Sequence, residues 1–153
     1  MQINKDANLI SIRNINTIAI LDQTTLKVKW ALKDYTRMQH SPKQGSNGNI
    51  VIYDNWGNIT AKSPFTVITR IIELDPRSLQ TKWTFPEKYT PKGITTLTGS
   101  NLQTLQNNNI LACLNNQGII EISPAKEIVW HLQFPVIFAK RYMPLEVPFL
   151  KTL

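Results

Sequence analysis

Three stretches of the chain follow one pattern: residues 8–30 read NLISIRNINTIAILDQTTLKVKW, residues 70–83 read RIIELDPRSLQTKW, and residues 109–130 read NILACLNNQGIIEISPAKEIVW. Each stretch ends at a tryptophan, and Trp30, Trp83 and Trp130 lie 53 and 47 residues apart. The second unit opens earlier, at residues 48–55 (GNIVIYDN), and contains an insertion. A period of roughly 40–50 residues is typical of the blades of β-propellers. The repeat therefore predicts a series of similar β-units.

Each unit divides into short strands separated by turn residues. Asp75-Pro76, Ser123-Pro124 and the Asn/Gly cluster at 115–118 are turn formers, because they fix φ or tolerate a positive φ. The expected strands are 9–13, 17–21, 27–31, 50–53, 71–74, 80–85, 110–114, 119–122 and 128–132. A further, innermost strand is expected near 39–43 and near 101–105. No amphipathic helix is evident.

These units predict an all-β fold of about three four-stranded antiparallel blades in a single partial propeller domain, residues 1–153. The blade-like units end near residues 32, 85 and 132, and prolines in the tail, 134–153, suit an irregular segment. A tryptophan on the last strand of each blade is expected to pack against the next blade.

Composition supports a folded domain and narrows its class. Hydrophobic residues make up 42% of the 153 residues and charged residues 18%, which favours a packed core over disorder. No apolar stretch is long enough for a membrane-spanning helix. The single cysteine, Cys113, excludes an internal disulfide and a cysteine-rich zinc site. No signal peptide is recognisable, which leaves the location undetermined: cytoplasmic by default, or periplasmic or secreted if an N-terminal part is missing.

The positive charge is spread along the chain. Seventeen Lys and Arg against ten Asp and Glu give a net charge of +7, which would suit an anionic partner. The lysines form no run of like charges and accompany no nucleic-acid-binding motif. We therefore expect no nucleic-acid partner.

The chain resembles the arylsulfotransferase-type β-propellers over roughly residues 8–150. The matching segments are RNINTIAILD at 13–22, KWAL at 29–32, QH at 39–40 with NGNIVIYDN at 47–55, TRIIELD at 69–75, GIIEI at 118–122 with EIVW at 127–130, and AKRY at 139–142. The block from QH to DN is the most specific. The resemblance implies a six-bladed ring of which this chain supplies the C-terminal half. It therefore implies pairing with another copy or with a missing N-terminal half.

The same resemblance implies an activity. Members of this family transfer a sulfuryl group from a phenolic sulfate ester to a phenolic acceptor through a histidine intermediate, without a metal or a nucleotide donor, so no cofactor is expected. Neutral imidazole is a good nucleophile near pH 7, and a guanidinium pairs bidentately with sulfate oxygens. The motif positions give His40 and Arg70 as catalytic residues, lining one channel, and Arg13 and Asn55 as substrate-binding residues. The alternative for Asn55, as for its neighbour Asp54, is that the residue shapes a turn.

Several positions depart from the family pattern. The aspartate that follows Gln-His in the family is Ser41 here, which removes a carboxylate that could orient the imidazole. The chain has only two histidines, and His131 lies on an outer-strand pattern, where a surface or packing role is expected. The nucleophile itself has no convincing match. The alternative function is a non-catalytic propeller scaffold or a ligand-binding segment.

Overall fold

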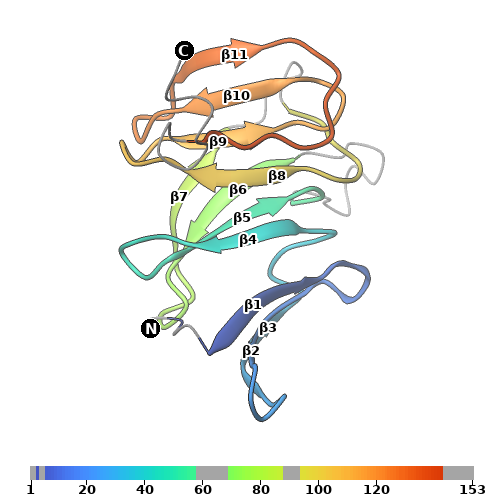
Figure 1. Ribbon diagram of the computed structural model, residues 1–153, viewed down its shortest axis with the longest axis vertical. Helices are drawn as coiled ribbons and strands as arrows, with labels where there is room; N and C mark the ends of the chain where they lie inside the picture. The colour runs from blue at the N-terminus through green and yellow to red at the C-terminus, as the bar shows by residue number, and fades with distance from the viewer. Residues whose placement is uncertain (1–2, 4–5, 58–68, 88–93, 143–153) are drawn as a thin grey trace.

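The computed structural model describes residues 3, 6–57, 69–87 and 94–142, and these form three antiparallel β-sheets arranged in series (Figure 1). The described residues contain eleven strands and no α-helix; one 3-10 turn, Arg13–Ile15, joins β1 to β2. The predicted all-β fold is confirmed. Within the described ranges, no helix is long and apolar enough to cross a membrane.

Each sheet is one blade. The first contains β1 (Ala7–Ile12), β2 (Thr17–Asp22) and β3 (Val28–Lys33). The second contains β4 (His40–Gln44), β5 (Ile50–Asp54), β6 (Arg70–Leu74) and β7 (Thr81–Phe85). The third contains β8 (Asn101–Thr104), β9 (Ile110–Cys113), β10 (Ile119–Ile122) and β11 (Ile128–Leu132). The first blade has three described strands rather than the predicted four: β1, β2 and β3 correspond to β5, β6 and β7 of the second blade.

The three repeated tryptophans occupy equivalent register positions. The cross-strand pairs are Ile20 with Trp30, Glu73 with Trp83, and Glu121 with Trp130. A β-bulge follows directly after each of these pairs. The sequence repeat is therefore a structural repeat, down to the position of the bulge.

Two of the tryptophans seal the contacts between blades. Trp30 packs against the apolar core between the first and second blades, which is built on Ile18, Ile50, Ile52, Ile72 and Leu74. Trp83 packs against the core between the second and third blades, and its indole N–H donates to the carbonyl of Pro124 at 3.0 Å. Trp130, in contrast, is 43% exposed. The expectation that every repeated tryptophan packs against a next blade is wrong for Trp130, because no further blade follows it among the described residues.

The tail packs along β8 on the face of the third blade that points away from the second blade. The side-chain amide of Asn101 pairs with the backbone of Ala139 through two hydrogen bonds of 2.6 and 2.9 Å. Gln103, two residues further along β8, pairs in the same way with Arg141, at 2.9 and 2.7 Å. The described tail residues, 134–142, form no strand, in agreement with the irregular tail that the prolines predicted.

The innermost described strands of the three blades lie in a row. β4 contacts β1 on one side and β8 on the other, and the three strands face the same side of the molecule (Figure 1). This row includes His40, the first residue of β4.

Candidate functional site

His40 is held by a buried asparagine. It lies opposite Tyr53 of β5, and its Nδ1 is 2.7 Å from Oδ1 of Asn55, whose side chain is fully buried. The Asn55 amide nitrogen donates to the carbonyl oxygens of Thr96 and Gly99, at 3.1 and 3.2 Å, so its oxygen must face the imidazole. An amide oxygen only accepts hydrogen bonds. The proton of neutral His40 therefore lies on Nδ1, and Nε2 carries a lone pair.

A second set of buried hydrogen bonds fixes Asn55. The Thr69 hydroxyl donates to the backbone carbonyl of Asn55 at 3.1 Å and accepts from the backbone N–H of Thr96 at 2.8 Å. The Thr96 hydroxyl in turn donates to the Tyr53 oxygen at 3.0 Å. Burial raises the pKa of Tyr53 to about 12, so this phenol stays neutral. Because these polar groups satisfy one another, the imidazole is held at a defined angle.

Arg70 is engaged with Asp54. The two residues are cross-strand partners on β6 and β5, and Arg70 Nε lies 2.8 Å from Asp54 Oδ2. The second carboxylate oxygen accepts the Arg37 backbone N–H at 2.7 Å. Burial raises the pKa of Asp54, and the hydrogen bonds from Arg37 and Arg70 oppose that shift. Gly57 packs closely against this ion pair, so a Cβ at position 57 would collide with the Arg70 side chain.

The expected pairing of His40 with Arg70 on one channel wall does not form. Side chains alternate along a strand, and Tyr53 and Asp54 are neighbours on β5. His40 pairs with Tyr53, on the face that packs toward the third blade, whereas Arg70 pairs with Asp54, on the face that packs toward the first blade. The two side chains thus lie at the same end of the sheet but on opposite faces.

The remaining candidates lie apart. Arg13 is in the turn between β1 and β2, on the preceding blade, and donates to the side chain of Asn14 at 3.1 Å. Asn55 is buried, so its side chain positions His40 and does not make the direct contact with a substrate that the resemblance predicts. His131 is exposed on β11, opposite Ile120.

A cleft between β4 and β8 begins at the residue after His40. Its cavity volume is about 300 Å³. Its lining comprises Ser41, Lys43, Gln44, residues 101–104, Phe138 and Lys140. The two lysines and the exposed phenyl ring of Phe138 suit an aromatic anion.

Sequence reasoning missed the cationic and aromatic side chains of this cleft. Lys43 lay in no motif, the AKRY segment gave Lys140 no role, and the tail returns to β8 only through long-range hydrogen bonds. It also missed Thr96, which reaches Asn55 from the connection between β7 and β8. In the described parts of the chain, no group of three or more His, Cys, Asp or Glu side chains could hold a metal ion.

Comparison with known proteins shows the fold alone. No protein-family model and no curated protein matches the chain. Among solved structures, the chain is similar to a protein of unknown function from Bacteroides caccae, with a TM-score of 0.62 and 13% sequence identity. The match covers 87% of this chain but only 47% of that protein, so the chain spans about half of its length. The arylsulfotransferase resemblance therefore stays a prediction.

Proposed function

We propose that this chain transfers a sulfuryl group from a phenolic sulfate ester to a phenolic acceptor, with Nε2 of His40 as the atom that carries the group. The supporting observation is the 2.7 Å hydrogen bond between His40 Nδ1 and Asn55 Oδ1. It leaves Nε2 unprotonated, and no described residue hydrogen-bonds that atom. An oriented neutral imidazole is the requirement for a nucleophilic histidine.

The transfer proceeds in two displacement steps at sulfur. Nε2 attacks the sulfur, an N–S bond forms, the S–O bond to the phenol breaks, and the phenolate leaves with the electron pair. The imidazole ring then bears a positive charge, which the Asn55 carbonyl oxygen stabilises through the Nδ1–H bond. In the second step the acceptor oxygen attacks the sulfur and the N–S bond breaks. The acceptor's phenolic proton passes to solvent, and Nε2 regains its lone pair.

The cleft between β4 and β8 supplies the substrate chemistry of this proposal. Lys43 and Lys140 would neutralise the sulfate, and Phe138 would pack against the aromatic ring. Ser41 joins this cleft to His40 along β4.

One observation favours the alternative of a ligand-binding segment without catalysis. Arg70 is paired with a buried carboxylate on the far face of the sheet, so its guanidinium does not serve as an anion clamp for His40. The cleft would then bind an aromatic anion without reacting with it.

Incubation with p-nitrophenyl sulfate and a phenol distinguishes these functions, because nitrophenolate release is read by absorbance. Transfer predicts release that His40→Ala abolishes and His131→Ala, the matched histidine control, leaves unchanged. Mass spectrometry should find the sulfuryl adduct on the peptide that contains His40. Binding of p-nitrophenyl sulfate by the wild type without any release would establish the ligand-binding alternative and refute transfer.

A further inference from the structure

The second and third blades repeat a carboxylate clamp made from the turn before the blade's second strand. In the second blade, the side-chain nitrogens of Asn47 and Asn49 donate to one oxygen of Glu73, at 2.8 and 2.6 Å. In the third blade, Asn107 and Asn109 donate to one oxygen of Glu121, at 3.4 and 2.7 Å. Each glutamate is the cross-strand partner of the repeated tryptophan. Each clamp therefore fixes one carboxylate oxygen and leaves the other to a further partner.

In the third blade that partner is an arginine. Nη2 of Arg141, from the tail, lies 2.6 Å from the second oxygen of Glu121. The Asn109 and Arg141 hydrogen bonds lower the pKa of Glu121, so the carboxylate is ionised when it meets the guanidinium. The molecule thus contains one filled example of the clamp, and the group that fills it is a guanidinium.

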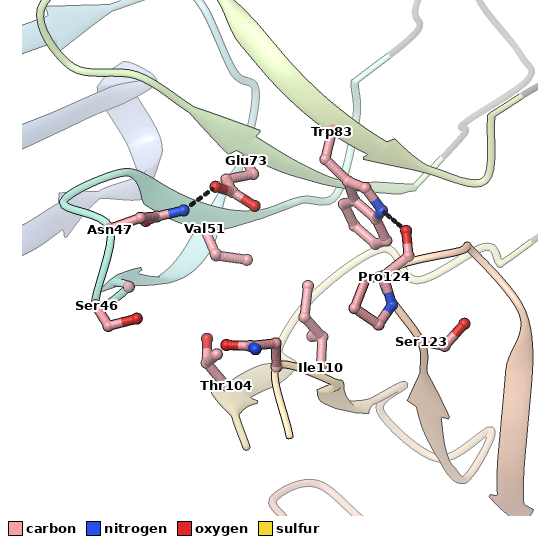
Figure 2. Close-up of a pocket in the computed structure, with 11 residues that line it drawn as sticks. Ser46, Asn47, Val51, Glu73, Trp83, Thr104, Ile110, Ser123 and Pro124 are labelled. Atoms are coloured by element: carbon pink, nitrogen blue, oxygen red, sulfur yellow. Dashed lines mark hydrogen bonds between the residues drawn. The ribbon is translucent and has the colours of Figure 1, made fainter. Parts of the chain in front are cut away.

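The clamp of the second blade opens onto a cleft instead. No described Lys or Arg lies within ion-pair distance of Glu73, and no described residue hydrogen-bonds its second oxygen. A crevice with a cavity volume of about 160 Å³ adjoins it between the second and third blades. Figure 2 shows Glu73 and Asn47 on one side of this crevice, Trp83 and Pro124 on the other, and Val51 and Ile110 between them.

The residues that line the crevice indicate a cationic ligand. Among the described residues that line it, Glu73 is the only charged one. Trp83 cannot turn freely, because its indole N–H is bonded to Pro124 (Figure 2). An indole is the aromatic group that binds cations best. In the first blade the position of Glu73 is held by Ile20, which is buried, so the acid is a feature of particular blades and not of the repeat.

We propose that this crevice is a binding site for a guanidinium group, received by Glu73 and Trp83. The second oxygen of Glu73 accepts from the guanidinium N–H groups, as Glu121 accepts from Arg141. The indole of Trp83 contacts the cation or its apolar stem, and Val51 and Ile110 form an apolar floor. The ligand is an alkylguanidine or an arginine side chain of a peptide. The site is independent of the chemistry at His40.

Titration of the full chain with n-butylguanidinium tests the proposal, followed by the NMR signal of the Trp83 indole N–H. We expect saturable shifts centred on Trp83, with a dissociation constant on the order of 1–10 mM for so small a ligand. Neutral n-butylurea has the same shape without the charge, and it should bind at least about tenfold more weakly. Equal binding of the urea, or shifts centred elsewhere, would overturn the proposal.

Variants separate the carboxylate from the fold. Glu73→Gln keeps the size and an oxygen for the asparagine donors, and should weaken n-butylguanidinium binding about tenfold or more. Glu127→Gln removes the same charge from an exposed position outside the crevice and should change affinity by less than about twofold. A loss of affinity shared by both variants would attribute binding to overall charge and refute the site. N-acetyl-glycyl-arginyl-glycinamide then distinguishes the sources: tighter binding than n-butylguanidinium indicates an arginine of a peptide, weaker binding a free guanidine.

Discussion

Asn55→Ala provides the sharpest test of how His40 is held. The Asn55 side chain bonds His40 Nδ1, the Thr96 carbonyl and hydroxyl, and the Gly99 carbonyl. Thr96 O then shares the single proton of the Thr69 hydroxyl with the Asn55 backbone carbonyl, and half-buried His40 can turn to water. One or two buried groups are then left unpaired, at about 1–3 kcal/mol each, so we expect a loss of about 2–4 kcal/mol in the free energy of unfolding.

Urea denaturation followed by tryptophan fluorescence measures this loss. Asn14→Ala, at an exposed turn, is the matched control and should change stability by less than about 0.5 kcal/mol. A value for Asn55→Ala as small as that of the control would refute the role of the buried network. The nitrogen chemical shifts of His40 give a second readout: the wild type should carry its proton on Nδ1 near neutral pH, and the variant should lose this preference. A proton on Nε2 in the wild type would contradict the proposed nucleophile.

Two further perturbations test the ion pair and the blade contacts. Arg70→Met leaves buried Asp54 without its cation and should cost about 2–4 kcal/mol by urea denaturation. Burial raises the pKa of Asp54 in the folded protein above its ordinary value of 3.8, so the stability that the protonated carboxyl contributes is lost as pH rises from 3.8 through the folded pKa. Arg70→Met should make this loss of stability with pH steeper, and Asp54→Asn should remove it. A flat pH profile in the wild type and both variants would contradict the assignment. Trp83→Ala should lower the thermal midpoint more than Trp130→Ala, since Trp83 joins two blades and Trp130 is 43% exposed; equal effects would refute the sealing role.

The sequence was sufficient for the strands because turn chemistry marks their ends. Asp75-Pro76 and Ser123-Pro124 delimit β6 and β10 within a residue or two, and the tryptophan spacing anticipated a shared register. These features are local, so they depend little on the rest of the fold.

The site was harder to predict because it depends on which face of the strand each residue occupies, and on long-range contacts. A shift of one residue along β5 separates the face of Tyr53 from that of Asp54, and this separates His40 from Arg70. The bulge after His40, where Ser41 has φ +49°, also has no sequence marker. The contact from Thr96 to Asn55 spans 41 residues and carries no pattern at all.

The amide side chains of Asn101 and Gln103 hold the tail against the third blade. Being two residues apart on β8, they match the two-residue spacing of Ala139 and Arg141 and substitute for the edge of a neighbouring strand. In a repeat array this is the role of a capping unit, which shields the last face from further stacking. A fourth blade could dock on that face only after displacing four hydrogen bonds and the Arg141–Glu121 ion pair. Addition of a blade at this end would therefore compete with the tail, which pairs with β8 but leaves β11 and Trp130 exposed.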